Sequence, residues 1–291
     1  MPANTHFRFE QRPSDLGLFL TIIRHSRSQG RNPQDALSLR ASWHDIAIDL
    51  RHLHAFHQAC SLDAAAGISI LYPMTLTYPL ILRMLSSGTA PMPLFRALNT
   101  RMLMQQHRAL KADDRPSIDA EVTAVRNVKK GLELDLQARM LVDGAPTWDC
   151  SMTFFYRARS NGSAAASPDA GMRVTRSDFH ANWYLPSSGA LRFGRLSGDT
   201  NPIHYGKFYA KAFGFERDFA QPLLVLGQAI SRLPAPPADQ GQQLEARLKG
   251  PVYYERNLKL QGERNANGIC FEVYCEPNPK PSICASFAAL G

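Results

Sequence analysis

The chain has 291 residues, of which 44% are apolar and 20% charged, with a formal net charge of +8. A chain of this length can bury a sizeable core, and its composition lacks the low hydrophobicity and high charge of a disordered protein. The composition therefore predicts a folded protein of one large unit or two packed units, and its positive charge favours an anionic partner.

Several protein classes are disfavoured. Residues 68–85 and 222–233 are the longest apolar stretches, but proline or polar residues interrupt both, so no membrane span is expected. The first residues lack the basic and apolar segments of a secretion signal, which predicts a cytoplasmic protein. The basic residues are dispersed, without the basic and aromatic run of an RNA-binding strand, so no nucleic-acid partner is expected. Five cysteines without paired spacing predict reduced packing residues.

Taken in chain order, residues 1–32 predict an N-terminal arm whose only clear pattern is the apolar run 18–23. Within a first domain, 33–157, the apolar stretch 73–85 predicts a buried helix that Pro79 disturbs or that is entered through a turn. Alternating segments then predict three strands, at 117–127, 131–142 and 147–157. Lys-Lys-Gly and Asp-Gly separate them, so we expect an antiparallel meander with tight turns. Residues 158–171 are small and polar and predict a linker.

The second domain, 172–291, repeats this order in outline. The sequence predicts a strand at 172–183, a short helix or turn at 187–198 and an apolar helix at 222–233. Three further strands are expected, at 243–259, 268–276 and 282–290. Each half thus offers a buried helix followed by a meander, which is the element order of a hot-dog fold. The predicted class is α+β: a double hot-dog, with two antiparallel sheets, each wrapped around a central helix and joined as a pseudo-dimer.

One segment, Leu-Ser-Gly-Asp-Thr-Asn-Pro-Ile-His, carries the candidate chemistry. Gly198 frees the backbone before Asp199, and Asn201-Pro202 forces a turn that can fold Asp199 and His204 towards each other. A carboxylate and an imidazole facing one point can hold a water molecule and exchange protons with it, without a metal. The alternative is a structural role, with Asp199 as a helix cap and His204 as a turn histidine.

The whole segment, with Ala-Phe-Gly-Phe shortly after it, resembles the signature of the MaoC-like (R)-specific enoyl-CoA hydratases. The resemblance implies that Asp199 and His204 bind the water that adds reversibly to C3 of a trans-2-enoyl thioester, giving an (R)-3-hydroxyacyl thioester. The loop around the pair would be supported by four residues: Ser197, Gly198, Asn201 and Pro202.

The resemblance also implies a backbone N–H that stabilises negative charge on the thioester oxygen at the N-terminus of the central helix. Matching the family's His-Gly pair to Gln-Pro-Leu-Leu-Val-Leu-Gly-Gln assigns this role to Gly227. Two positions depart from the family pattern. Leu226 stands where the family has histidine, and Gly206 lies in the stretch where an acidic residue or serine is usual, so the loop is expected to be braced differently.

The first half lacks the motif and resembles the degenerate first domain of double hot-dog hydratases, which gives room to long or bulky acyl chains. Candidate acyl-lining residues are Met74, Leu76, Tyr78, Leu82 and Met84, with plain core packing as the alternative. The resemblance implies an acyl-CoA or acyl carrier protein thioester as the partner, no separate cofactor, and a monomer or homodimer.

Two other functions remain open: a hot-dog thioesterase, and a non-catalytic acyl-thioester-binding or partner subunit. A thioesterase would place a carboxylate on or near the central helix, and Gly227-Gln228-Ala229-Ile230 offers none. No metal site is expected, because a helix would scatter His52, His54 and His57 over different faces.

Overall fold

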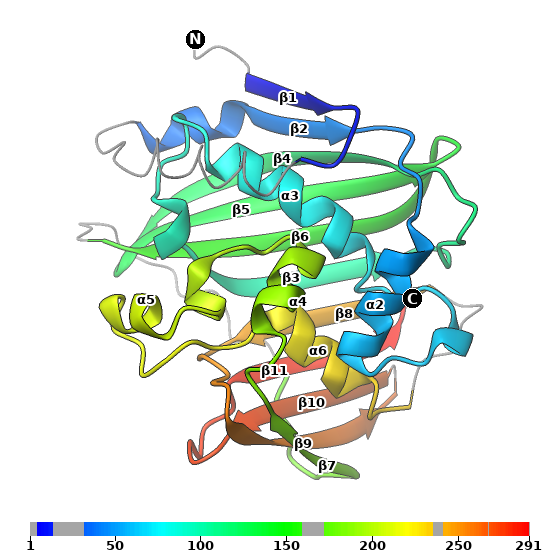
Figure 1. The fold of residues 1–291 in the computed structure, drawn as a ribbon, viewed down its shortest axis with the longest axis vertical. Helices are drawn as coiled ribbons and strands as arrows, with labels where there is room; N and C mark the ends of the chain where they lie inside the picture. Colours follow the sequence, from blue (N-terminus) through cyan, green and yellow to red (C-terminus); the bar gives the residue numbers. More distant parts are fainter. Residues whose placement is uncertain (1–4, 14–31, 159–171, 235–240, 267, 291) are drawn as a thin grey trace.

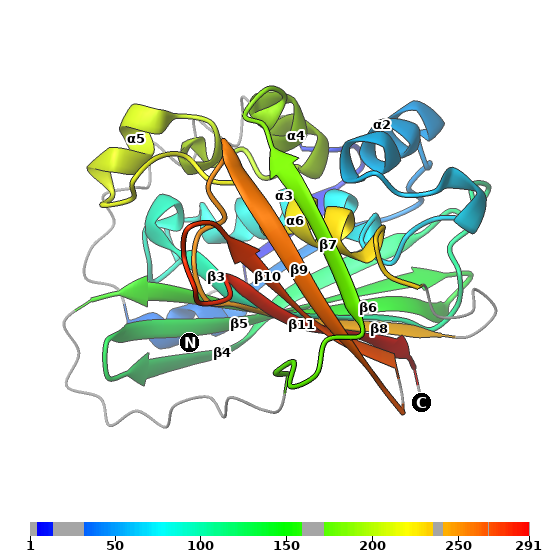
Figure 2. The same ribbon diagram turned by 90° about the horizontal axis from the view of Figure 1, so that it is seen from below.

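The computed structural model describes residues 5–13, 32–158, 172–234, 241–266 and 268–290, which form a long curved sheet with helices on one face (Figures 1 and 2). The strands are β1 (Thr5–Phe9), β2 (Leu39–Trp43), β3 (Leu98–Gln106), β4 (Ser117–Val128), β5 (Gly131–Val142), β6 (Ala145–Arg157), β7 (Phe179–Leu185), β8 (Gln242–Leu248), β9 (Arg256–Asn265), β10 (Gly268–Cys275) and β11 (Ile283–Ala289). The α-helices are α2 (Leu50–Cys60), α3 (Pro73–Leu85), α4 (Ala190–Ser197), α5 (Lys207–Ala212) and α6 (Pro222–Ile230). Short 3₁₀ turns are η1 (Pro33–Ser38), η2 (Ala64–Ala66), η3 (Leu94–Arg96) and η4 (Pro202–His204).

The strand order shows that the chain is built from two equivalent halves. Along the sheet it runs β1-β2-β4-β5-β6-β3-β8-β11-β10-β9-β7. Apart from β1, the second half of this list repeats the first in reverse, with β3 and β8 paired antiparallel at the centre. Each half wraps around one buried helix, α3 or α6 (Figure 1). The double hot-dog fold predicted from the sequence is confirmed.

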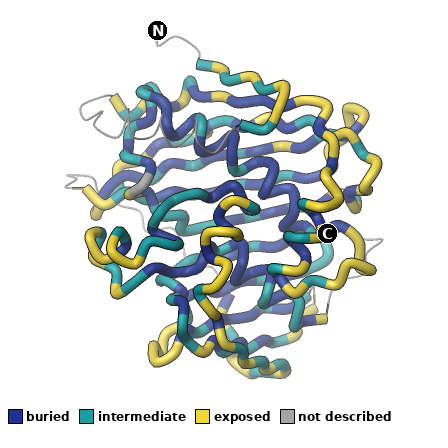
Figure 3. The backbone as a smooth tube through the Cα atoms, in the orientation of Figure 1, coloured by how far each residue is buried: buried dark blue, intermediate teal, exposed yellow. Residues whose placement is uncertain are grey.

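The core lies between the sheet and these two helices, where most residues are coloured as buried in Figure 3. In α3, Leu80 and Ile81 are completely buried, as are Val225 and Leu226 in α6. Removing a large aliphatic side chain of this kind from water stabilises the fold by about 1.5–3 kcal/mol. Both helices begin with proline, which lacks an N–H where a helix cannot use one. This shared pattern sets the two helix starts.

The predicted helix at 73–85 is confirmed at both ends, and Pro79 lies inside it. The three strands of the first meander are also confirmed, as β4, β5 and β6. The sequence missed β3, which joins the halves, as well as β2 and α2.

Two strand predictions in the second half were wrong in extent. The segment expected to be one strand over 243–259 forms two strands, β8 and β9. Gly250 and Pro251 lie in the break, where Pro251 has no N–H for a ladder and Gly250 donates to Ser282 O at 3.2 Å. The strand expected at 172–183 is shorter and later: β7 begins at Phe179.

The arm predicted for residues 1–32 contains β1, whose residues pair in parallel with β2. The apolar run 18–23 and all of the predicted linker except Ala158 lie outside the described residues. No helix within the described ranges is long and apolar enough to cross a membrane.

Candidate active site

The candidate site is built on the loop that follows α4. This helix ends at Gly198, which adopts the left-handed conformation with φ of 80°. A Cβ atom on Gly198 would lie 2.9 Å from the Cγ and Cδ atoms of Pro79 in α3. Glycine is therefore needed both for the backbone angle and for the close approach of the two halves.

Beyond Gly198, the loop brings Asp199 and His204 together. The Oδ2 atom of Asp199 lies 3.2 Å from Nε2 of His204, and each residue is only 6% exposed. The Asn201 N–H donates to Asp199 Oδ1 at 3.3 Å, and the Asp199 N–H donates to Ser197 Oγ at 3.2 Å. Asn201 Oδ1 accepts from the Ile203 N–H at 3.2 Å and so caps η4, which carries His204. The side chains of this short loop hold its shape.

The protonation of His204 follows from its other nitrogen. Nδ1 lies 2.9 Å from the carbonyl oxygen of Phe219, which can only accept, so Nδ1 carries a hydrogen. Phe219 is itself fixed by a bridge to Tyr253 and by the Ala220 N–H, which donates to Val252 O at 2.8 Å. Nε2 is therefore the atom that gains or loses a proton, and it faces Asp199.

Tyr78 joins the site from the other half of the molecule. Its side chain, on α3, lines the same cavity as Asp199, and its hydroxyl lies near the Asp199 carboxylate. Burial, followed by the negative charge of Asp199, holds the pKa of Tyr78 well above its ordinary value. The hydroxyl therefore keeps its proton and remains a donor.

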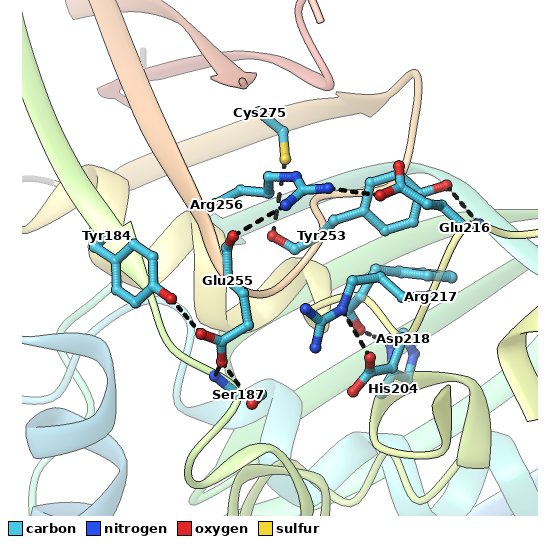
Figure 4. Close-up of polar contacts among 11 residues, drawn as sticks. Tyr184, Ser187, His204, Glu216, Arg217, Asp218, Tyr253, Glu255, Arg256 and Cys275 are labelled. Atoms are coloured by element: carbon cyan, nitrogen blue, oxygen red, sulfur yellow. Dashed lines mark hydrogen bonds and ion pairs between the residues drawn. The ribbon is translucent and has the colours of Figure 1, made fainter. Parts of the chain in front are cut away.

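The segment that supplies the Phe219 carbonyl is tied down by ion pairs, and Figure 4 shows them beside His204. Arg217 Nε donates to Asp218 Oδ1 at 3.0 Å, and Arg256 donates to Glu216 Oε1 at 2.6 Å. These contacts connect the segment before α6 to the start of β9.

Glu255, the residue just before β9, connects this strand to the loop that precedes α4 (Figure 4). It accepts from the N–H and the hydroxyl of Ser187, at 2.7 and 2.6 Å, and from Tyr184. Hydrogen bonds from Ser187, then from Tyr184, lower the pKa of Glu255 to about 2. The carboxylate is ionised at neutral pH and holds the loop before α4.

A cavity of about 70 Å³ opens directly onto the Asp199–His204 pair. Its lining comes from both halves: Tyr78, Leu82, Leu94, Ala97, Leu98, Asn99, Phe154, Asp199, Asn201, Ile203, His204, Phe219 and Pro222. A larger groove of about 260 Å³ shares Leu98, Asn99, Phe219 and Pro222 with it and continues over Val225, Val252 and Ile283. Polar groups thus lie at one end of a mostly apolar passage.

Of the five acyl-lining candidates, Tyr78 and Leu82 line the cavity. Met74, Leu76 and Met84 do not; they are buried core residues, with Met74 Sδ 3.9 Å from Cys150 Sγ. Leu76 and Met84 fall on other faces of α3, whereas Met74 lies one turn before Tyr78 and packs against Cys150, so the helical pattern alone did not separate lining residues from core residues. The role of Tyr78 towards Asp199 was missed, because nothing in either half's sequence shows a contact between halves.

Gly227, predicted to be the backbone donor at the start of the central helix, is placed elsewhere. It is the sixth residue of α6, where its N–H belongs to the helical hydrogen-bond ladder. A Cβ there would lie 2.6 Å from Cys60 Sγ, so the glycine allows α6 to pack closely against α2. The prediction is wrong because the helix begins at Pro222, and Pro222 is the α6 residue that lines the cavity.

The two departures from the family pattern have structural roles. Leu226 is completely buried in the core. The Gly206 N–H donates to Pro202 O at 2.7 Å, where a Cβ would lie 2.9 Å from that oxygen. Tyr205 braces the loop instead, since its hydroxyl donates to Thr200 O at 2.7 Å.

The cysteines and His52 lie outside the candidate site and make packing or backbone contacts. All five cysteines are free thiols, and four of them are buried. His52 Nε2 lies 2.9 Å from Leu196 O, at the end of α4. Among the described residues, no group of three or more His, Cys, Asp or Glu side chains could hold a metal ion.

Comparisons with known proteins agree with this architecture. No family model matches the chain. In sequence it is 22% identical over 191 residues to 3-hydroxyacyl-thioester dehydratase X of Mycobacterium tuberculosis, covering 66% of this chain and 68% of the relative.

Three solved structures are similar in fold. The crystal structure of HtdX from M. tuberculosis superposes with a TM-score of 0.73 at 19% identity, over 86% of this chain and 100% of the other. A MaoC-like dehydratase from Phytophthora capsici gives 0.72 at 15% identity, over 89% and 98%. An M. tuberculosis protein with a double hot-dog fold gives 0.53 at 15% identity, over 97% and 94%. The chain thus has the double hot-dog fold and is similar in structure to MaoC-like dehydratases.

Proposed function

We propose that this protein catalyses the reversible hydration of trans-2-enoyl thioesters to (R)-3-hydroxyacyl thioesters. The observation that carries the proposal is the buried Asp199–His204 pair, 3.2 Å apart, at the end of a mostly apolar cavity. The similarity to a 3-hydroxyacyl-thioester dehydratase supports the reaction class. The (R) configuration rests on the resemblance of the loop to the hydratase signature.

In the hydration direction, water lies in the cavity beside the pair and contacts both Asp199 Oδ2 and His204 Nε2. The imidazole takes one proton from the water while the oxygen forms a bond to C3, and the carboxylate orients the second hydrogen. The electron pair of the double bond moves towards the thioester carbonyl and gives an enolate-like state. His204 then returns the proton to C2, so that the product has gained one water molecule and no electrons have been exchanged.

The enolate-like oxygen needs a hydrogen-bond donor. The first turn of α6 offers one, because Pro222 lines the cavity and the Leu223 N–H next to it has no acceptor within the helix. The helix dipole adds a partial positive charge at this end. We place the thioester oxygen at this turn, in the role first assigned to Gly227.

The rest of the substrate occupies the passage. The acyl chain packs on Tyr78, Leu82 and Phe154, and the carrier arm follows the adjoining groove past Lys249. Coenzyme A bears phosphates and acyl carrier proteins are typically acidic, so the net charge of +8 suits either carrier.

A thioesterase of the same fold is the main alternative. It would need a carboxylate that directs water at the thioester carbonyl beside the start of α6. Within the described lining of the cavity, Asp199 is the single carboxylate, and it is paired with His204. This arrangement favours attack at C3.

The test is the loss of enoyl absorbance with trans-2-enoyl-CoA substrates of increasing chain length. Asp199→Asn and His204→Ala should each lower kcat by at least about a hundredfold, the effect of losing a positioned acid or base. A matched control is the surface pair His107–Asp149, 2.7 Å apart and away from the cavity. Asp149→Asn and His107→Ala should retain wild-type rates, whereas equal activity in all four variants would refute the assigned roles.

A further inference from the structure

The two halves are equivalent element by element, so the active-site loop has a counterpart in the first half. The reversed strand order pairs β2 with β7 and β3 with β8, and correspondingly α2 with α4 and α3 with α6. The loop after α2 therefore occupies the position that the Asp199–His204 loop occupies after α4.

The two loops share their turn elements, although the first-half loop has one residue fewer between the left-handed residue and the cap of the 3₁₀ turn. Helix α2 ends at Ser61 with φ of 57°, as α4 ends at Gly198 with φ of 80°. Each loop then forms a 3₁₀ turn, η2 or η4. Asp63 Oδ1 accepts from the Ala65 N–H at 2.9 Å, just as Asn201 Oδ1 accepts from the Ile203 N–H. The same caps hold both loops.

This match aligns the catalytic positions. The residue after the left-handed cap is Asp199 in one loop and Leu62 in the other. The last residue of the 3₁₀ turn is His204 in one and Ala66 in the other. The first-half loop therefore has the shape of the active-site loop without its acid and base.

This loop also faces a cavity, of about 270 Å³, at the end of the helix pair opposite to the active site. Its lining again comes from both halves: Leu62, Asp63, Ala66, Gly67, Ile68, Ser69, Gln106, Ala109, Ile230, Ser231, Leu233, Gln242 and Phe287. Leu62, Asp63 and Ala66 line it as Asp199, Asn201 and His204 line the first cavity.

The lining indicates the chemistry of a ligand. Most of the side chains are apolar, and Asp63 is the one charged side chain in the described lining, with Oδ1 already engaged by Ala65. Phosphate groups are therefore disfavoured. Gln106 is only 4% exposed, and its Oε1 has no hydrogen-bond partner among the described residues. An amide N–H of a ligand can satisfy this oxygen.

We propose that this second cavity binds the acyl-pantetheine part of a thioester without converting it. The proposal rests on the proposed function for the identity of the ligand and on the matched loops for the site. Leu62 and Ala66 provide neither a base nor a ligand for water, so a thioester bound there is retained unchanged. The pantetheine arm supplies amide N–H groups for Gln106, and the acyl chain packs on Ile230, Leu233 and Phe287.

The experiment is a calorimetric titration of the full chain with octanoyl-pantetheine, a saturated probe that cannot be hydrated. The wild-type protein should bind two molecules. Ala109→Trp and Ala66→Trp each fill the second cavity from an exposed position on its rim, and either should reduce the stoichiometry to one. Ala145→Trp, at the exposed first residue of β6, which lines neither cavity, is the matched control and should bind two.

The hydration rate of a short enoyl-CoA separates the two proposals. Ala109→Trp should keep wild-type turnover while losing one bound probe. If both tryptophan variants remain folded and still bind as many probe molecules as the wild type, the second site is overturned. The second site is equally overturned if the wild type binds a single probe molecule and enoyl substrate displaces it, because that molecule then occupies the active site. In a further outcome, the wild type binds a probe that Ala109→Trp no longer binds, yet shows no hydratase activity. That result would support ligand binding in the second cavity and refute only the proposed function.

Discussion

At the residue scale, the proposed hydration depends on which nitrogen of His204 carries a hydrogen. The Phe219 carbonyl fixes a hydrogen on Nδ1 of His204, so in the proposed reaction Nε2 is left to exchange a proton with water. Asp199 faces this nitrogen, and the Tyr78 hydroxyl lies near the Asp199 carboxylate. The acid and the base are thus oriented by groups that do not themselves react.

We propose that the Tyr78 hydroxyl donates to Asp199 when substrate is bound. Tyr78→Phe should then lower kcat by roughly ten- to a hundredfold, because a hydrogen bond to a charged group contributes about 1.5–3 kcal/mol. The steady-state hydration rate measures this effect. Tyr72→Phe is the control. Tyr72 is a buried tyrosine at the start of the same helix, but its hydroxyl lies 3.3 Å from His52 Nδ1 and not beside Asp199. A Tyr78→Phe enzyme with unchanged kcat would show that the hydroxyl does not position Asp199.

The residues of the motif could be predicted from sequence because the loop is local: a glycine, an Asx cap and a proline within six positions set its shape. Tyr78 could not, since its contact with Asp199 crosses between halves far apart in sequence. Gly227 was misplaced because a glycine pattern does not define where a helix begins, whereas Pro222 does.

At the element scale, the site depends on close contact between α3 and the loop after α4. Pro79 interrupts the helical hydrogen bonds of α3, and its ring lies against Gly198. The sequence predicted α3 well, since proline at its start and a continuous apolar face are local signals. It did not reveal β3 or β1, because their pairing with β8 and β2 is specified by packing between distant segments.

Gly198→Ala should destabilise the fold by about 1–2 kcal/mol for the left-handed backbone alone and should also lower activity, because the methyl group pushes Pro79 away. Gly144→Ala separates these effects. Gly144 has a similar φ of 78°, but nothing lies within 4 Å of its Cβ position. Chemical denaturation should show a loss of stability in both variants, and kinetics a loss of activity only in Gly198→Ala. Equal activity in the two would contradict the contact with Pro79.

At the scale of the whole molecule, one buried base links stability to pH. His57 on α2 is 4% exposed, and neither ring nitrogen has a hydrogen-bond partner among the described residues. Burial, followed by the nearby His54, lowers the pKa of His57 below its ordinary value. The unfolded chain, with an ordinary histidine pKa of about 6.5, therefore binds a proton more readily than the folded one.

The contribution of neutral His57 is complete above about pH 6.5 and decreases as the pH falls below it. His57→Leu should accordingly lose less stability than the wild type between neutral pH and about pH 5. Denaturant unfolding at several pH values measures the difference, with His107→Leu, at an exposed histidine, as the control. Parallel curves for wild type and His57→Leu would contradict a buried neutral imidazole.

The two-half architecture has a larger consequence, since the same fold supplies one loop with acid and base and another with leucine and alanine at the same positions. Under the two proposals, the second half supplies the reacting groups and the loop of the first half serves binding alone. This division depends on the reaction at Asp199 and His204 being hydration at C3.

The most direct measurement is the fate of the water oxygen. Crotonyl-CoA is incubated with the protein in ¹⁸O-labelled water, and the products are analysed by mass spectrometry. Hydration at C3 predicts 3-hydroxybutyryl-CoA with one labelled hydroxyl oxygen and an intact thioester, and no such product with Asp199→Asn. Free crotonate carrying the label in its carboxylate, without labelled hydroxyacyl-CoA, would contradict the hydratase and identify a thioesterase.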